Sequence, residues 1–379
     1  MPSPTTIAAP KAPARKAPLA ARLALAVVVL SLGLVTLEAP ALIGLVDYRR
    51  VLATTDDPRL NPENLPDRSC SYRHRPGIHR VGATFGNVAS AWRIPGARPH
   101  RFDVRYDRYG FRNPRDLTRA EVAVVGDSFI EGGLVAAPEL LTAVLARLEG
   151  VTVANLGQCG YGPREELAVV RRFALPLRPR WVVWSFFEGN DLDDLRRPES
   201  PGLDPFPDRS FGRNLALALG RLVTVAPDPR AATCFGQVAG TRVYFPEPAG
   251  PLAPEDLDAL GRLRAILDEA RADCRRAGAD LLVVFVPTAF RALGPLCRFE
   301  ADSPCRSWSP SDLPDRLRDL VAGLGPGVEF LDLTTPLRRA AAEGPLPYFD
   351  DDTHWSPAGH RAAARAVADR LDLGDSLRR

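Results

Sequence analysis

Apolar and polar positions over residues 119–371 alternate between short apolar runs and longer segments of helical periodicity. Five runs rich in Val, Leu and aromatic residues predict buried strands, at 122–125, 151–155, 181–187, 281–286 and 328–331. The segments between them predict helices, near 137–148, 163–174, 254–277, 311–322 and 357–371. Because strands that alternate with helices are typical of a parallel sheet, we expect a three-layer α/β/α doubly wound sheet of about five strands.

A different apolar pattern lies near the N-terminus and has no polar spacing. Residues 23–37 are apolar, and 39–46 extend the stretch to roughly the 20 residues that cross a bilayer, with Glu38 as its only charge. Four basic residues precede it, at Lys11, Arg15, Lys16 and Arg22. By the positive-inside rule, this pattern predicts a cytoplasmic N-terminus and an extracytoplasmic remainder.

We therefore expect a basic Pro/Ala-rich tail over 1–20 and a transmembrane signal-anchor helix over 21–46. The part beyond the helix would be periplasmic if the source is Gram-negative. The small residues at 39–41 leave a cleaved signal peptide as an alternative, and a buried core helix is a third interpretation.

Two segments have no clear place in the alternation. Residues 47–118 show little periodicity and are expected to wrap or connect the main domain, which we place at 119–375. Residues 192–253, rich in Pro, Arg and Gly, predict a long insertion that shapes substrate choice, with a short helix near 215–223.

Composition and charge narrow the class of protein. With 45% hydrophobic and 25% charged residues, the 379-residue chain can bury a substantial core. The formal net charge is only +3, and basic residues do not form the stripe that nucleic acids require. We expect contact with a membrane through the N-terminal helix but no nucleic-acid partner, and the oligomeric state stays open.

The six cysteines lack the spacing of a zinc site or a redox motif. In an oxidising compartment Cys297 and Cys305 are candidates for one disulfide, and Cys70 and Cys234 for a second. Cys274 lies in a helical pattern and is expected to be buried.

Polar residues gather where the predicted strands end. Gly126, Asp127 and Ser128 follow the first strand, and the sequence NLGQCGYG at 155–162 closes the second. EGND at 188–191 follows the third, and DDDTHWSPAGH at 350–360 follows the fifth. Because ligands bind beyond the carboxyl ends of parallel strands, these groups predict one shared site. A serine, a histidine, an aspartate and amide donors suit acyl transfer through a serine ester.

In these blocks the chain resembles the SGNH, or GDSL-type, hydrolase superfamily over about 119–371. The resemblance implies a flavodoxin-like SGNH fold, with Ser128 as nucleophile and His354 as base. It also implies Asp351 as the residue that orients His354, although Asp350 and Asp352 are rivals. The oxyanion hole would take the backbone N–H groups of Ser128 and Gly157 and the side chain of Asn190.

One position departs from that pattern, since Glu188 stands where the family usually has glycine. Upstream, YDRYGFRNP at 106–114 resembles a segment of exported, membrane-tethered members. His360 is expected to be structural or partner-facing rather than catalytic. Trp355 is expected to line the site or pack against the sheet, with a sugar platform as a lesser alternative.

Three classes of function remain open. The leading one is a serine esterase that removes an O-acyl group from an envelope glycan or lipid through an acyl-Ser128 intermediate. The second is an O-acyltransferase, because DTHW at 352–355 resembles a motif of enzymes that acetylate exopolysaccharides such as alginate. The third is a non-catalytic glycan-binding or assembly protein.

A metal-dependent phosphoesterase built on Asp127 and the aspartate run is a further rival. No histidine-rich ligand set accompanies these carboxylates in the sequence. We therefore expect neither a metal nor another cofactor.

Overall fold

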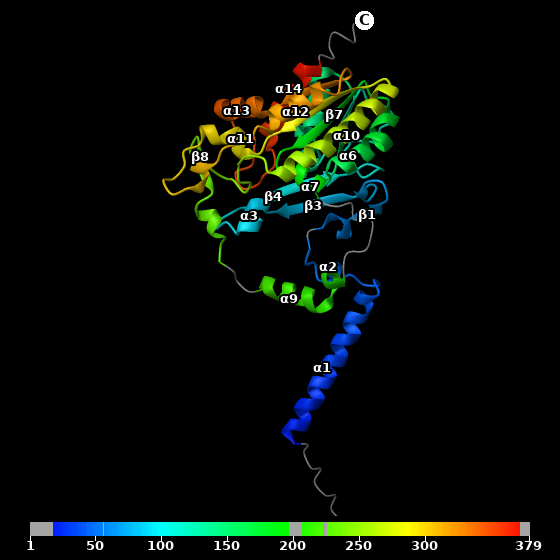
Figure 1. Ribbon diagram of the computed structural model, residues 1–379, viewed down its shortest axis with the longest axis vertical. Coiled ribbons are helices and arrows are strands. Elements are labelled where there is room, and N and C mark those ends of the chain that lie inside the picture. Colours follow the sequence, from blue (N-terminus) through cyan, green and yellow to red (C-terminus); the bar gives the residue numbers. More distant parts are fainter. Residues whose placement is uncertain (1–17, 56, 197–205, 223–225, 372–379) are drawn as a thin grey trace, which may run out of the picture. The chain divides into compact units, whose positions relative to one another are not determined.

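A computed structural model describes residues 18–55, 57–196, 206–222 and 226–371 of the chain. The described residues divide into two compact units, one drawn from 1–56 with 201–224 and the other from 57–200 with 225–379. The larger unit holds the predicted sheet (Figure 1).

The central sheet of the larger unit has five parallel strands in the order β11-β10-β7-β5-β6. The strands are β5 (Val122–Gly126), β6 (Val153–Gly157), β7 (Trp181–Phe187), β10 (Asp280–Val286) and β11 (Val328–Asp332). Each overlaps a predicted strand, so the expected α/β fold is confirmed. Strand β5 lies between β6 and β7, and the loops that follow those two strands therefore flank Ser128.

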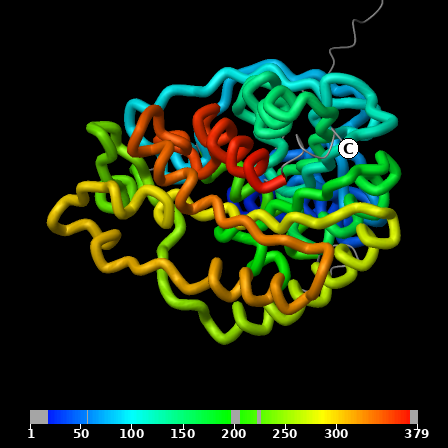
Figure 2. The backbone as a smooth tube through the Cα atoms, turned by 90° about the horizontal axis from the view of Figure 1, so that it is seen from above, coloured from blue at the N-terminus to red at the C-terminus, as the bar shows by residue number. Residues whose placement is uncertain are grey.

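Helices cover both faces of this sheet and bury its two apolar sides. One face packs against α6 (Pro163–Val169), α10 (Pro254–Arg276) and α12 (Leu313–Ala322). The other packs against α5 (Leu141–Glu149), α11 (Ala289–Leu293), α13 (Thr334–Glu343) and α14 (Pro357–Leu371). Figure 2 shows α14, in red, close to the teal turns of α5, and these two helices share an extensive contact.

The predicted helices are present with small shifts at their ends. The helix expected at 163–174 continues beyond α6 as a π-helical turn, Val170–Ala174. Helix α10 begins at Pro254, where the missing N–H costs nothing, and Asp256 accepts a hydrogen bond from the backbone N–H of Ala253 at 2.7 Å.

Residues 57–118 form two antiparallel ribbons that the sequence pattern did not reveal. They pair β1 (Asn64–Asp67) with β2 (Ser71–His74), and β3 (His79–Thr84) with β4 (His100–Arg105). Between β3 and β4 lies the short helix α3 (Asn87–Trp92). Strands of four to six residues with largely exposed faces give too little alternation to be recognised.

The predicted insertion also contains regular elements. In the larger unit these are α7 (Asp191–Arg196), β8 (Phe235–Val238) and β9 (Thr241–Tyr244). Within the described residues, only 206–222 of the insertion belong to the smaller unit.

The smaller unit contains the N-terminal apolar helix α1 (Leu19–Leu42), together with α2 (Tyr48–Val51), α8 (Phe206–Arg209) and α9 (Phe211–Leu222). Helix α1 is long and apolar enough to cross a membrane. The carboxylate of Glu38 accepts hydrogen bonds from the N–H groups of Phe211 and Gly212, at 2.9 and 2.7 Å. The one acidic residue of the apolar stretch thus caps the first turn of α9, the helix expected near 215–223.

All six cysteines are free thiols in the structure. The pairing of Cys70 with Cys234 is wrong, because these residues pack in the cores on opposite faces of the sheet. Cys274 is buried on α10, as expected.

Candidate active site

Ser128 begins the four-residue helix α4 (Ser128–Glu131), directly after β5 and its neighbour Asp127. Asp127 caps this helix by accepting a hydrogen bond from the N–H of Phe129 at 2.9 Å. A Cβ atom on Gly126 would lie 2.5 Å from Ile130 and 2.7 Å from Ser185. The tight turn that presents Ser128 therefore requires glycine at position 126.

The hydroxyl of Ser128 contacts a histidine from the far end of the chain. Its Oγ lies 2.7 Å from Nε2 of His354, and Nδ1 of His354 lies 2.6 Å from Oδ1 of Asp352. With Nδ1–H donating to the carboxylate, Nε2 is left to accept the Ser128 proton. A serine, a base and an orienting acid are thus in hydrogen-bond contact, which is the geometry of a serine nucleophile.

The expectation that Asp351 orients His354 is wrong. The carboxylate of Asp351 instead lies 2.7 Å from Nε2 of His100, on β4. Asp352, one residue later, also accepts the N–H of His354 at 2.9 Å, which closes a tight turn between them. The turn brings the nearer aspartate to the imidazole, rather than the one three residues away.

Helix α3 holds this turn from the opposite side. The N–H of Asn87 donates to Oδ2 of Asp352 at 2.6 Å, and Oδ1 of Asn87 accepts the N–H of Thr353 at 3.0 Å. Asp352 therefore accepts hydrogen bonds on both oxygens, one from His354 and one from Asn87. Nothing in the sequence marked Asn87, because it lies 265 residues away from its partner Asp352.

The charges of this pair favour a protonated histidine. Burial opposes the charged form of His354, but the hydrogen bond and charge of Asp352 outweigh it, so its pKa is raised above 6.5. Burial also opposes the charge of Asp352, yet the bond from His354 keeps the pKa of Asp352 below its ordinary value. Asp127, completely buried nearby, has a pKa raised to about 6 by loss of solvation.

The expected oxyanion donors are only partly available. The N–H of Gly157 already donates to Oδ1 of Asn155 at 3.0 Å, so its proposed role is wrong. Within the described residues, the N–H groups of Ser128 and Gly160 have no acceptor. Gly160 has a φ of 77°, which suits glycine, and it lies in the loop after β6. Asn190 follows β7 and donates one hydrogen bond, to Asp194, at 3.3 Å.

A buried network of hydrogen bonds around Glu131 stabilises the turn that carries Ser128, called the serine turn. The carboxylate of Glu131, the last residue of α4, accepts from the hydroxyl of Tyr106 at 2.6 Å and the N–H of Cys159 at 2.6 Å. Nε2 of His74 lies 3.1 Å from the same carboxylate. Burial opposes the charge of Glu131, but these partners lower its pKa to about 2. Glu131 therefore ties α4 to β2, to residue 106 and to the loop after β6.

Arg112 holds the other end of the same turn. Its buried guanidinium donates to the carbonyl oxygens of Glu131 at 3.0 Å, of Val135 at 2.8 Å, and of Gly132. These carbonyls form the C-terminal end of α4 and the loop that follows it. The segment 106–114, noted in the sequence without an assigned role, thus braces the turn that carries Ser128.

Two further carboxylates lie near the site. Glu188, at the family's glycine position, forms a partly buried ion pair with Arg291 at 2.5 Å and accepts a hydrogen bond from the N–H of Thr288 at 2.9 Å. Glu247 comes from the insertion, after a strand whose Tyr244 donates its N–H to the carbonyl of Asp350 at 3.3 Å. Burial raises the pKa of Glu247 to about 7, although the charge of His354 opposes this rise.

The two remaining predicted residues are structural. Nδ1 of His360 accepts the N–H of Leu141 at 3.1 Å, and burial lowers the pKa of His360 to about 3, so this ring is neutral. Trp355 is 1% exposed and packs edge-on against Phe129, with ring centroids 5.1 Å apart. It packs against the core, and the alternative of a sugar platform is wrong.

For the metal-dependent alternative, no group of three or more His, Cys, Asp or Glu side chains arranged to hold a metal ion occurs among the described residues. One carboxylate oxygen of Asp127, the residue on which this alternative was built, accepts the hydrogen bond that caps α4.

Comparison with known proteins bears on the C-terminal half of the site. Residues 252–377, a third of the chain, match the family described as the SGNH hydrolase-like domain of the acetyltransferase AlgX. The matched range includes Asp352 and His354 but not Ser128. A comparison with curated protein sequences gave no significant match.

Solved structures with a similar fold include several esterases. An acetylxylan esterase from Geobacillus stearothermophilus, solved as a catalytic mutant, is 14% identical, with a TM-score of 0.37, covering 68% of this chain and 95% of its own. A carbohydrate esterase family 2 enzyme from Corynascus thermopiles is 13% identical, with a TM-score of 0.35, covering 74% and 76%. At TM-scores below 0.5, these likenesses carry no functional weight.

The parallel sheet with a serine turn at the end of its central strand, met there by a histidine and an aspartate, defines an α/β protein that acts on ester bonds. Residues 252–377 match the family of SGNH hydrolase-like domains, and the five-stranded parallel sheet fits that fold, so the predicted resemblance is confirmed.

Proposed function

We propose that the protein is a serine esterase that removes an O-acyl group from an envelope glycan or lipid. The observation that carries the proposal is the continuous contact from Ser128 Oγ through the imidazole of His354 to Asp352, at 2.7 and 2.6 Å. No other arrangement in the described residues presents a hydroxyl to a base that is itself oriented by a carboxylate.

In the proposed reaction, His354 takes the Ser128 proton while Oγ attacks the acyl carbon. The negative charge that develops on the carbonyl oxygen would meet the free N–H groups of Ser128 and Gly160 and an N–H of the Asn190 side chain. His354 then gives its proton to the departing alcohol, which leaves an acyl-Ser128 ester. A water molecule activated by the same imidazole releases the acid and restores the serine.

Acyl transfer is the second candidate, favoured by the match of 252–377 to a domain of an acetyltransferase. The first half of the reaction is unchanged, but a sugar hydroxyl takes the place of water in the second half. The two activities differ only in which nucleophile reaches the acyl-serine.

The full chain in detergent micelles provides the test. We expect it to hydrolyse a short-chain nitrophenyl ester and to label with a serine-directed fluorophosphonate. Ser128→Ala should abolish both, whereas Ser309→Ala, an exposed serine of the same unit, should change neither. Absence of an adduct on Ser128 would refute both catalytic proposals and favour a binding protein. Acyl-sugar formation measured beside acid release separates the two activities.

We further propose that α1 anchors the protein and that the larger unit lies outside the cytoplasm. The proposal rests on the apolar length of α1 and on the basic residues before it. Protease added to intact spheroplasts should digest the larger unit. Digestion only after lysis would contradict this topology.

A further inference from the structure

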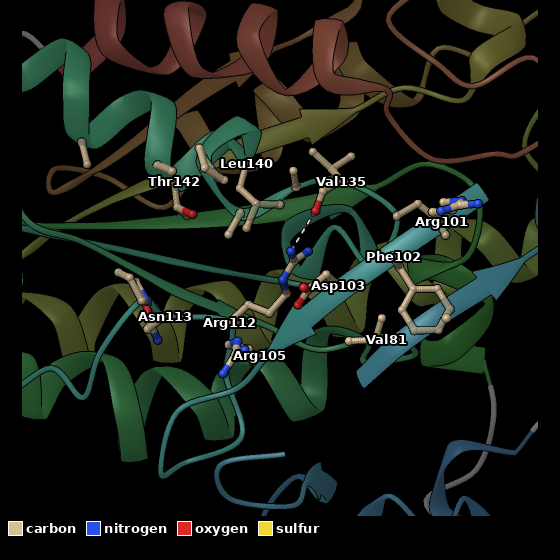
Figure 3. A pocket seen from close by; sticks show the side chains of 18 of the residues that line it. Val81, Arg101, Phe102, Asp103, Arg105, Arg112, Asn113, Val135, Leu140 and Thr142 are labelled. Atoms are coloured by element: carbon tan, nitrogen blue, oxygen red, sulfur yellow. Dashed lines mark hydrogen bonds between the residues drawn. The ribbon is translucent and has the colours of Figure 1, made fainter. Parts of the chain in front are cut away.

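A cavity of about 1090 Å³ lies in the larger unit between the β3–β4 ribbon and helix α5 (Figure 3). Val81 and Ala83 line it from the ribbon, while Leu134, Leu140 and Ala143 line it from the loop after α4 and from α5. The residues that line it do not include Ser128, Asp352 or His354. The cavity is as large as the pockets that enclose drug-sized ligands, and most of its wall is apolar.

The register of the ribbon explains why exposed side chains face this cavity. Val81 pairs with Asp103 and Ala83 pairs with Arg101, so these four side chains share one face of the ribbon. Protein covers that face only in part, and Val81 remains 68% exposed. A large, mostly apolar cavity that opens beside an exposed apolar side chain is typical of a ligand-binding site.

The cavity also carries unbalanced positive charge. Arg101 and Arg105 line it, and neither guanidinium has a hydrogen bond or ion pair with a side chain or carbonyl in the described part of the chain. Arg112 lines it as well, and its guanidinium binds carbonyl oxygens rather than a carboxylate. The one acidic lining residue is Asp103, whose carboxylate lies 2.8 Å from His79. Three arginines against one carboxylate favour an anionic ligand.

We propose that this cavity binds a single-chain fatty acid, with its alkyl chain along the apolar wall and its carboxylate at Arg101 or Arg105. Each CH₂ group removed from water improves affinity about fourfold, so a long chain suffices for tight binding. A fork-shaped guanidinium suits the planar carboxylate. This inference is independent of the proposed ester chemistry, because Ser128, His354 and Asp352 do not line the cavity.

The test uses the full chain in phosphatidylcholine nanodiscs and a palmitic acid analogue with a photoreactive diazirine in its chain. We expect cross-links in peptides covering 81–105 and 134–146, and competition by unlabelled palmitate. An analogue with a phosphate head group should label the same peptides, whereas the matching long-chain alcohol should label them at least about fivefold less, since it lacks the charge.

Two variants examine the two halves of the site. Ala143→Trp should fill the cavity and abolish labelling. Arg101→Gln combined with Arg105→Gln should weaken affinity about tenfold, while Arg339→Gln, an exposed arginine on α13, should leave it unchanged. Thermal melting shows whether each variant is folded. If Ala143→Trp does not fold, the double arginine variant tests the proposal by itself. Labelling that maps elsewhere, equals that of the alcohol, or persists in the arginine variant would overturn the proposal.

Discussion

Oδ1 of Asp352 lies 2.6 Å from Nδ1 of His354, whereas the neighbouring Asp351 is bound to His100. The two adjacent aspartates thus contact different histidines. Their arrangement depends on α3, in which the N–H of Asn87 donates a hydrogen bond to the second carboxylate oxygen of Asp352. The position of the orienting acid is thus set jointly by a local turn and by a distant element.

Replacing the orienting acid tests this assignment. Asp352→Asn should lower kcat for ester hydrolysis by about 10³ to 10⁴, because the amide cannot hold the imidazole in the reactive tautomer. Asp351→Asn should cost less than about tenfold, since it loses only the contact with His100. Steady-state kinetics on a nitrophenyl ester distinguishes them. Equal losses, or a larger loss at Asp351, would return the role to Asp351.

The pH dependence of activity should report the raised pKa of His354. A base must be neutral to accept the Ser128 proton, so kcat/KM should rise with pH through a pKa above 6.5. In Asp352→Asn the residual activity should rise at a lower pH, because the charge that holds the proton is gone. If kcat/KM of the wild type instead rises through a pKa below 6, the proposed ion pair between His354 and Asp352 would be contradicted.

Glu247 should influence the same titration. Its carboxylate raises the pKa of His354, so Glu247→Gln should move the acid limb of kcat/KM to lower pH. The effect should be smaller than that of Asp352→Asn, because Asp352 is hydrogen-bonded to the ring and is a larger cause of the shift. Glu255→Gln, on the exposed start of α10, serves as the matched control. If the acid limb of kcat/KM is unchanged in Glu247→Gln, the carboxylate of Glu247 does not interact with the imidazole of His354.

Arg112 is expected to stabilise the fold through the serine turn. Arg112→Met should lower the free energy of unfolding by about 3 kcal/mol, since three buried carbonyl oxygens lose a charged donor. Urea denaturation measures this loss, and Arg339→Met should stay within about 0.5 kcal/mol of wild type. The rate of fluorophosphonate labelling should also fall in the Arg112 variant. If Arg112→Met is as stable as the wild type, the serine turn does not depend on the hydrogen bonds of Arg112.

Stability should also depend on pH through Glu166, which is fully buried on α6 beside Asp191. Burial, followed by repulsion from Asp191, raises the pKa of Glu166 well above its ordinary value. The folded state therefore keeps a proton that the unfolded chain releases, and stability is lost as pH rises from about 4.5 towards the folded pKa.

Glu166→Gln mimics the protonated acid and should remove that loss. The variant should gain stability relative to wild type as pH increases from 5 to 8, measured by urea denaturation at each pH. Glu165→Gln, its half-buried neighbour, should show no such trend. A Glu166 variant that loses stability equally at both pH values would mean that the carboxyl is needed as an acceptor, not tolerated as a buried acid.

Much of the fold followed from local patterns. Four strands of the central sheet are short apolar runs that are buried on both faces, whereas the edge strand β11 is half-buried. Helix α10 repeats Leu260, Leu263 and Leu267 on its buried side. The ribbons over 64–105 escaped recognition because their strands are short and half exposed. Hydrophobic periodicity is informative only where a regular element buries a continuous face.

By itself the sequence determined the parallel α/β class and the apolar N-terminal helix, and it singled out the serine and the histidine that contact each other, because each depends on local residue order or on a compact motif. Only the tertiary structure decided that Asp352 rather than Asp351 meets His354, that Gly157 is already engaged by Asn155, and that residues 106–114 brace the serine turn. The choice of Asp352 depends partly on Asn87, 265 residues away, and the support of the serine turn depends on contacts between residue 112 and residues 131–135. The contact of Gly157 with Asn155 spans only two residues but depends on how the end of β6 is folded. These outcomes follow from folded geometry and packing rather than from spacing along the chain.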